Sequence, residues 1–178
     1  MVTLNSPLEK TSFHGGFIQS IEGMRSFAVL AVLLFHLQVP GFAGGFLGVD
    51  LFFVISGFII TRNILSDLHN RKFSLKEFYI RRFRRLYPAL LVTVLLTLSV
   101  AAALVPPVEL VNTARSALYA LLSLANINFW MESGYFDAAA DAKPLLHTWS
   151  LSVEEQFYLF WPGLLLICHP RGGAGLSL

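Results

Sequence analysis

Two ionisable side chains, Arg25 and His36, interrupt the apolar stretch MRSFAVLAVLLFHLQ. On a helix their spacing leaves only about 20° of angular offset, so both side chains project from one face, roughly 16 Å apart along the axis. Ionisable groups at membrane depth usually face a bundle interior or a hydrated cavity. Two interpretations stay open. Either Arg25 extends to one headgroup layer while His36 lies near the opposite interface, or both line one polar path.

A carboxylate follows His36 after the short turn PGFAGG at 40–45. Because the turn is short, Asp50 and His36 are expected at the same end of two helices, within hydrogen-bond reach of each other. A carboxylate that orients an imidazole makes it a better base. The alternative is that Asp50 caps the start of its helix. Ser56 lies beside the helical face that carries Asp50.

Glycines around the same turn have the spacing of closely packed helices. The patterns Gly41-x-x-x-Gly45 and Gly44-x-x-x-Gly48 indicate that two backbones approach each other.

Arginines are concentrated in the run RRFRRLYP, which contains two overlapping R-x-x-R pairs, Arg81/Arg84 and Arg82/Arg85. On a helix the members of each pair lie on one side and can present two guanidinium groups to one anion, as suits a phosphate. The alternative is that these residues fix orientation and contact anionic lipid.

A second polar group occurs in the stretch HTWSLSVEEQFY. Ser150, Glu154 and Tyr158 share one helical stripe, Glu155 lies beside it, and His147 precedes it by one turn. Two adjacent carboxylates and a histidine in an apolar helix are not expected to face lipid. A structural polar network and a functional site both remain open.

Other chemistries lack their sequence signals. The chain has no Walker loop, no G-x-S-x-G elbow and no G-x-G-x-x-G fingerprint, and no nucleic-acid partner is expected. The short ligand spacing of a metal site is also missing, so no metal is predicted. The residues that such a site would draw on are His36, Asp50, His147 and Glu154.

Composition predicts the elements that position these residues. The chain has 178 residues, of which 55% are hydrophobic and 13% charged, whereas about a quarter are charged in soluble domains. We expect an all-α, polytopic integral membrane helix bundle in residues 20–168, after a polar lead at 1–19 and before an irregular tail at 169–178. About five membrane segments are predicted, at residues 21–39, 46–62, 87–105, 113–130 and 148–168.

The distribution of basic residues predicts orientation. Eight of the thirteen Lys and Arg residues lie in a predicted loop at 62–86, which places this loop and the N-terminus in the cytoplasm. Tyr87 and Pro88 are taken as the start of the following helix. The side of the loop at 131–147 stays open, because it depends on whether segment 113–130 crosses fully.

Four blocks of this sequence together resemble the membrane-bound acyltransferase-3 family. They occur in the family's order over residues 20–163, and they are IEGMRSFAVLAVLLFHL, GGFLGVDLFFVISGFIIT, FYIRRFRRLYPALL and PLLHTWSLSVEEQFYLFWP. The resemblance implies an integral membrane O-acyltransferase of the bacterial inner membrane. Such an enzyme moves an acyl group, typically acetyl, from cytoplasmic acyl-CoA to a hydroxyl of an extracytoplasmic glycan or lipid-linked sugar, such as lipopolysaccharide or peptidoglycan.

The resemblance also implies roles for individual residues. His36 would be the general base or carry the acyl group transiently, Asp50 would orient it, and Glu154 or Glu155 would tune the site. Acyl-CoA would be a co-substrate, with no tightly bound cofactor, and membrane lipids would surround the protein. The arginines implied in acyl-CoA binding are Arg25, Arg81, Arg82, Arg84 and Arg85. The residues implied in shaping the substrate site are Ser56, His147, Trp149, Ser150 and Tyr158.

The chain departs from the family in its length. Family members usually have about ten spans, whereas this chain has room for about five of about 20 residues each. We therefore expect the N-terminal half of a truncated domain, with a C-terminal half as a further partner. The alternatives are an inactive fragment and a transporter-like protein whose buried charges form an ion path.

Overall fold

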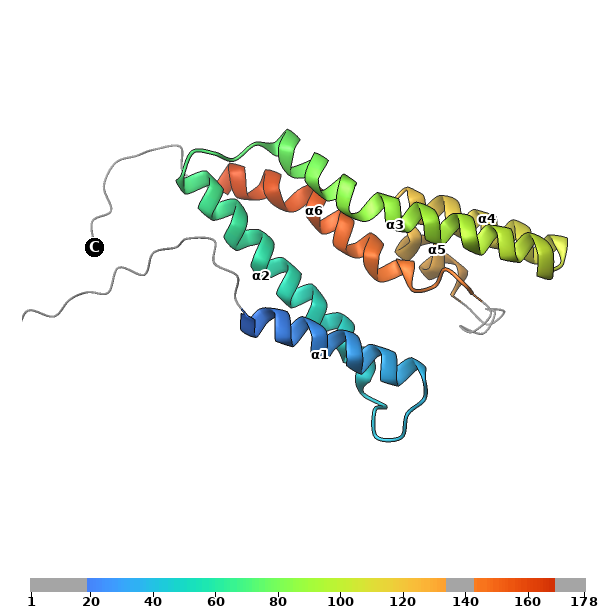
Figure 1. The fold of residues 1–178 in the computed structure, drawn as a ribbon. Coiled ribbons are helices and arrows are strands. Elements are labelled where there is room, and N and C mark those ends of the chain that lie inside the picture. Colours follow the sequence, from blue (N-terminus) through green and yellow to red (C-terminus); the bar gives the residue numbers. More distant parts are fainter. Residues whose placement is uncertain (1–18, 134–142, 169–178) are drawn as a thin grey trace, which may run out of the picture. The chain divides into compact units, whose positions relative to one another are not determined.

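The computed structural model describes residues 19–133 and 143–168, and every regular element in these ranges is a helix (Figure 1). The predicted all-α class is therefore confirmed for this part of the chain. The lead at 1–18 and the tail at 169–178 lie outside the described residues. The elements are α1 (Gln19–His36), the 3-10 helix η1 (Gly45–Leu47), α2 (Gly48–His69), α3 (Leu75–Leu104), α4 (Pro107–Leu121), α5 (Ala125–Glu132) and α6 (Thr148–Cys168).

Two of the described helical segments are long and apolar enough to cross a membrane. They are Gly45–His69 and Leu75–Leu104, whose most apolar windows of 18 residues have mean hydropathies of 1.7 and 2.1. The other described helices are shorter or less apolar. The expected number of about five membrane segments is therefore not confirmed.

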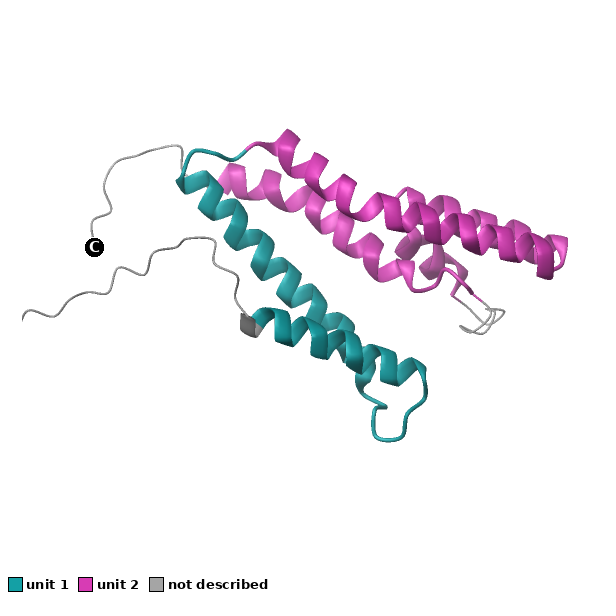
Figure 2. Cartoon of the chain, viewed as in Figure 1, with its two compact units in different colours: residues 1–73 teal, residues 74–178 magenta. Residues whose placement is uncertain are grey.

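The chain divides into two compact units, residues 1–73 and residues 74–178 (Figure 2). The first unit contains α1, η1 and α2, and the second contains α3 to α6. The two units are described separately below.

Glycines bring α1 close to the start of α2 in the first unit. A Cβ atom added at Gly45 would lie 2.2 Å from the carbonyl oxygen of Ala31, and one at Gly48 would lie 2.5 Å from that of Ala28. Real Cβ atoms do not approach a backbone oxygen so closely, so only glycine fits at either position. The close approach predicted from the glycine spacing is confirmed at these two positions. At Gly44, in contrast, an added Cβ would meet nothing within 4 Å.

Helix α3 begins earlier than the sequence analysis placed it. Ser74 is its N-cap, and the Ser74 Oγ accepts a hydrogen bond from the backbone N–H of Glu77. The expected helix start at Tyr87 and Pro88 is wrong, because α3 continues through Pro88. The predicted loop at 62–86 is wrong for the same reason. Its residues form the end of α2, a short turn and the first turns of α3.

The predicted fourth segment, 113–130, is two helices rather than one. Helix α4 ends at Leu121 and α5 begins at Ala125, with Ser123 between them in the left-handed region at φ 58°. This interruption, residues 122–124, is called the α4–α5 break below. Around it lies the core of the second unit. The buried residues of this core are Leu90, Val94, Ala117, Ala120, Ala125, Phe129 and Leu145.

Three helices end in the same backbone motif without a glycine. Gln38, Arg71 and Ser123 have φ of 54°, 55° and 58°, and each lies two positions after the last residue of its helix. The N–H of the next residue then bonds five residues back, as in Lys72 to the Asp67 carbonyl at 2.8 Å. This is the Schellman arrangement, which usually has glycine at the left-handed position.

Candidate functional site

His36 is the last residue of α1, and its imidazole is held by the helix itself. Its Nδ1 lies 2.8 Å from the carbonyl oxygen of Val32. Because a carbonyl oxygen only accepts, Nδ1 carries the hydrogen, which leaves the lone pair on Nε2. The side chain is exposed. In the neutral form of the ring, this hydrogen bond leaves Nε2 as the nitrogen that can act as a base.

Asp50 does not make the hydrogen bond to His36 that the sequence predicted. It lies in the first turn of α2 and is exposed. Within residues 19–133 and 143–168 it makes no hydrogen bond or ion pair, and the backbone of Val32 takes the place predicted for it. A carboxylate in the first turn of a helix interacts favourably with the helix dipole.

Arg25 contacts the neighbouring helix of its own unit. Its Cζ lies 5.7 Å from the ring centroid of Phe52 on α2, within the range of a cation–π contact. Ser56, one turn after Phe52, is buried with 7% of its surface exposed. Arg25 is therefore directed at α2, which favours the interpretation that it faces a helix rather than only extending to a headgroup layer.

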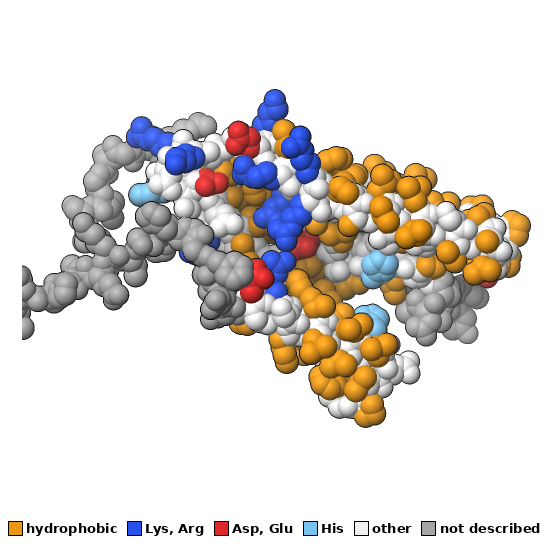
Figure 3. Space-filling view, in the orientation of Figure 1, with side chains coloured by type: hydrophobic (Ala, Val, Ile, Leu, Met, Phe, Trp, Pro, Cys, Tyr) orange, Lys and Arg blue, Asp and Glu red, His pale blue; other side chains and the backbone are white. Residues whose placement is uncertain are grey.

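The basic residues of α3 are confined to its first part, and the rest of the helix is covered by hydrophobic side chains (Figure 3). The predicted R-x-x-R arginines are on a helix, but they have different surroundings. Arg81 is exposed and pairs with Glu77 at 3.5 Å. Arg84 and Arg85 are exposed, whereas Arg82 is half-buried.

Arg82 lies against a predicted site residue of α6. Its Cζ is 4.9 Å from the ring centroid of Tyr158, whose hydroxyl donates a hydrogen bond to Glu154 Oε1 at 2.6 Å. Glu154 and Tyr158, two of the three residues predicted to share a helical stripe, are therefore in direct contact. Ser150, the third member of that stripe, instead donates to the His147 carbonyl oxygen at 3.2 Å. His147 and Trp149 are exposed at the start of α6.

Glu155 has a different set of partners from Glu154. Its Oε2 accepts a hydrogen bond from the hydroxyl of Ser123 at the α4–α5 break. The next residue, Gln156, donates from Nε2 to the Ser123 carbonyl oxygen at 2.8 Å and to Asn126 Oδ1 at 2.9 Å. The two adjacent glutamates thus serve different contacts, Glu154 toward Tyr158 and Glu155 toward the break.

Two further hydrogen bonds converge on the α4–α5 break. The Ser152 Oγ accepts from the backbone N–H of Ala125 at 3.1 Å, and the Tyr87 hydroxyl of α3 donates to the Leu121 carbonyl oxygen. Sequence analysis missed Ser152 and Gln156. Their signal was present, because they share one helical face with Glu155 at spacings of three and four residues.

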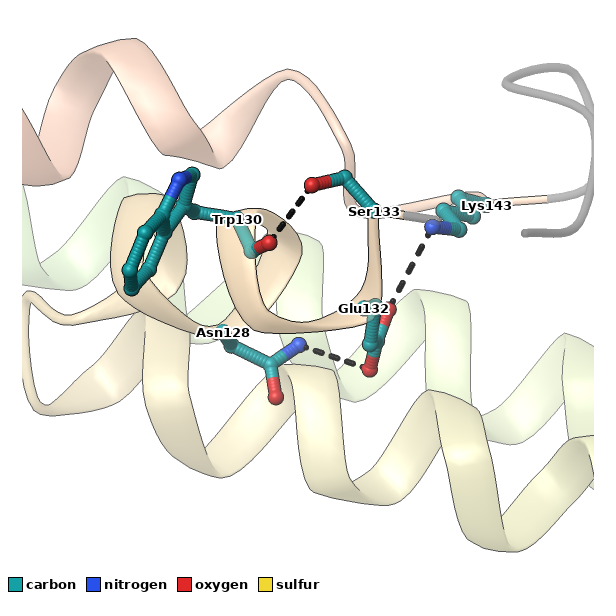
Figure 4. Close-up of polar contacts among 5 residues, drawn as sticks. All are labelled: Asn128, Trp130, Glu132, Ser133 and Lys143. Atoms are coloured by element: carbon teal, nitrogen blue, oxygen red, sulfur yellow. Dashed lines mark hydrogen bonds and ion pairs between the residues drawn. The ribbon is translucent and has the colours of Figure 1, made fainter. Parts of the chain in front are cut away.

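A smaller polar cluster joins the end of α5 to the segment that precedes α6. Figure 4 shows Glu132 between Asn128, which donates to its Oε1 at 3.0 Å, and Lys143, whose Nζ lies 3.4 Å from its Oε2. The Ser133 hydroxyl donates to the Trp130 carbonyl oxygen at 2.6 Å. No three His, Cys, Asp or Glu side chains lie together as metal ligands would in the described ranges.

Comparison with known proteins decides the family. A profile of the acyltransferase domain matches residues 18–178. The chain belongs to this acyltransferase family. The resemblance carried by the four sequence blocks is thereby confirmed, and the chain's apolar helices accord with a membrane protein.

Several named O-acetyltransferases are similar to this chain. The peptidoglycan O-acetyltransferase OatA of Listeria monocytogenes is 40% identical over 159 residues, which are 88% of this chain and 25% of the relative. The putative peptidoglycan O-acetyltransferase YrhL of Bacillus subtilis is 38% identical over 86% of this chain and 24% of its own length. The O-acetyltransferase OatA of Staphylococcus aureus is 39% identical over 82% of this chain and 24% of its own.

The chain spans about a quarter of the length of these relatives. No solved structure matches it significantly. Within the acyltransferase-family chain, the predicted site residues fall into both units. Arg25, His36, Asp50 and Ser56 belong to the first, and the α3 arginines and the α6 residues belong to the second.

Proposed function

We propose that this chain is an O-acetyltransferase that moves an acetyl group from acetyl-CoA to a hydroxyl of a glycan, with peptidoglycan as the acceptor. The observation that carries the proposal is the family match over residues 18–178 together with relatives at 38% to 40% identity that are named O-acetyltransferases. Two of these three names specify peptidoglycan. That is the support for this acceptor over the lipopolysaccharide also considered from the sequence.

The tautomer of His36 supports its role as general base. The Nε2 lone pair would accept the proton of the acceptor hydroxyl while the hydroxyl oxygen attacks the thioester carbonyl carbon. The C–S bond then breaks, and the coenzyme A thiolate takes the proton from the imidazolium. The Val32 carbonyl, which holds Nδ1 at 2.8 Å, does the orienting that was assigned to Asp50.

The arginines support binding of the donor. Coenzyme A carries phosphates, and guanidinium groups bind phosphates through paired N–H donors. Arg82 and its neighbours on α3 supply such groups in the second unit, and Arg25 supplies one in the first. The excess of Lys and Arg between residues 62 and 85 favours the cytoplasm for this part of the chain, hence a cytoplasmic donor and an acceptor on the far side of the bacterial cell membrane.

The test is acetyl transfer by His36 variants of the full chain in membranes. We expect His36→Ala and His36→Gln to reduce transfer of labelled acetyl from acetyl-CoA to peptidoglycan fragments by about a hundredfold or more. His69→Ala is the matched control, because His69 is an exposed histidine at the end of α2. Retained activity in both His36 variants would refute the role of His36. A complete lack of transfer by the unaltered chain would refute the proposed activity and favour an inactive fragment or an ion path.

A further inference from the structure

Arg82 differs from the other arginines of α3 in both its exposure and its neighbours. It is half-buried, whereas the other three are exposed. Its Cζ lies 4.9 Å from the ring centroid of Tyr158 and 5.7 Å from that of Phe78. Both distances fall within the roughly 6 Å of a cation–π contact. Phe78 and Tyr158 are each buried, with 6% of the residue surface exposed, so both rings are enclosed by neighbouring side chains.

The hydroxyl of Tyr158 fixes the ring that Arg82 contacts. It donates to Glu154 Oε1 at 2.6 Å, one turn earlier on the same helix. A phenol that donates to a carboxylate has a more electron-rich ring, and the negative face of such a ring attracts a cation more strongly. Glu154 therefore acts on Arg82 through Tyr158, both by orienting the ring and by polarising it.

One further hydrogen bond joins α3, which carries Arg82, to α6, which carries Tyr158. The Tyr79 hydroxyl of α3 donates to the carbonyl oxygen of Leu159 at 2.8 Å. Tyr79 lies one turn before Arg82, and Leu159 directly follows Tyr158. This bond connects α3 to α6 at the level where the guanidinium meets the ring.

We propose that Tyr158 and Glu154 are positioning residues that hold the guanidinium of Arg82 for a phosphate of coenzyme A. This inference rests on the donor assigned under the proposed function, and it singles out Arg82 from the four arginines of the run. A guanidinium carries five N–H donors in its plane. A contact of its Cζ with the Tyr158 ring is therefore compatible with the paired donors that a phosphate accepts.

The experiment measures equilibrium binding of coenzyme A and of pantetheine, which lacks every phosphate, to the purified full chain in lipid nanodiscs. We expect Tyr158→Leu and Arg82→Lys to raise the Kd for coenzyme A about tenfold. The Kd for pantetheine should stay unchanged in both. Tyr158→Phe keeps the ring and should stay within about threefold of the unaltered chain. Glu154→Gln keeps an acceptor for the Tyr158 hydroxyl, so it should weaken binding of coenzyme A no more than Tyr158→Phe does.

Phe160→Leu is the matched control for Tyr158→Leu, because Phe160 is on the same helix with 71% of its surface exposed. It should bind both ligands as the unaltered chain does. Equal weakening of coenzyme A and pantetheine by Tyr158→Leu would indicate a general loss of structure and would overturn the inference. An unchanged Kd for coenzyme A in that variant, or no binding of coenzyme A by the unaltered chain, would also overturn it.

The Kd for coenzyme A tests this inference, whereas the transfer of labelled acetyl tests the proposed function. His36→Ala should bind coenzyme A as tightly as the unaltered chain while transferring no acetyl group. If the unaltered chain distinguishes coenzyme A from pantetheine through Arg82 and Tyr158 but transfers nothing, then the proposed transfer is refuted and the positioning of Arg82 stands.

Discussion

Gln156 of α6 and Asn126 of α5 face each other through two amide hydrogen bonds. The Gln156 Nε2 donates to Asn126 Oδ1 at 2.9 Å, and the Asn126 Nδ2 donates to Gln156 Oε1 at 3.2 Å. The same Nε2 also donates to the Ser123 carbonyl oxygen at 2.8 Å. One side chain of α6 therefore holds both the α4–α5 break and the first turn of α5.

This relationship predicts an energetic coupling between the two amides. In a double-mutant cycle of Gln156→Ala and Asn126→Ala, we expect a coupling of about 1 kcal/mol in the free energy of unfolding, the size found for side-chain hydrogen bonds between membrane helices. Unfolding in detergent, followed by circular dichroism, measures it. Asn112→Ala on the exposed side of α4 is the control and should show no coupling to Gln156→Ala. Additivity of the two original substitutions would contradict the prediction.

The glycine contacts of the first unit predict a position-specific loss of stability. Gly45→Ala and Gly48→Ala would place a Cβ against the carbonyl oxygens of Ala31 and Ala28, so α1 must shift from α2. We expect each to lower the free energy of unfolding by about 1–3 kcal/mol, as overpacking does. Gly44→Ala meets nothing within 4 Å and should be nearly neutral. Equal melting temperatures for all three variants would show that this contact is not tight.

The left-handed residue that ends α2 predicts a stabilising substitution. Arg71 has φ 55°, a conformation that costs a residue with a Cβ about 1 kcal/mol and that glycine adopts freely. Arg71→Gly should therefore raise the free energy of unfolding by about that amount. Lys72→Gly removes the same charge from the next position, where φ is not positive, and should not stabilise. A lower melting temperature for Arg71→Gly than for Lys72→Gly would contradict this prediction.

Two ion pairs of the second unit should differ in strength because they differ in exposure. Glu132→Ala removes one partner of Lys143 and leaves the amide of Asn128, which has 2% of its surface exposed, without the acceptor Glu132 Oε1. We expect a loss of about 2 kcal/mol, since a buried donor is left unsatisfied. Glu77→Ala breaks the exposed pair with Arg81 and should cost about 0.5 kcal/mol or less.

Chemical denaturation in detergent compares these two variants directly. Added salt should reduce the small effect of Glu77→Ala more than that of Glu132→Ala, because exposed charges are screened more effectively. If Glu77→Ala cost as much as Glu132→Ala, then burial would not govern the strength of these pairs.

The helices themselves could be predicted from the apolar runs of the sequence, but two of their boundaries could not. The signal for the start of α3 was present, since Ser74 and Glu77 have the spacing of a capping box. Pro88 gives a competing signal, because proline is common in the first turn of a helix and therefore favours a later start for α3. The α4–α5 break has no such signal. Ser123 adopts the left-handed conformation without being glycine, and the hydrogen bonds that favour it come from α6, far away in the sequence.

The residues of the candidate site stay a prediction, but some of their contacts can be compared with the structure. The spacing of Glu154 and Tyr158 was sufficient to predict that they share one helical stripe, because both are on one helix, and in the structure they form a hydrogen bond. The partner of His36 was not predictable in this way. A backbone carbonyl one turn earlier competes with any carboxylate for Nδ1, and it is always within reach of a histidine at a helix end. Which of the arginines meets an aromatic ring likewise depends on how α3 and α6 pack.

The continuation of α3 through Pro88 also indicates how deep the basic part of this helix can sit. Proline has no N–H, so the carbonyl oxygen of Arg84 receives no hydrogen bond from residue 88. In hydrocarbon such an oxygen would be costly, whereas headgroup water can hydrate it. From there, residues 86–104 rise about 28 Å, close to the roughly 30 Å of a bilayer's apolar layer. A membrane position in which Pro88 and the arginines before it lie at the headgroup level would therefore match both the free carbonyl oxygen of Arg84 and the length of the apolar part of α3.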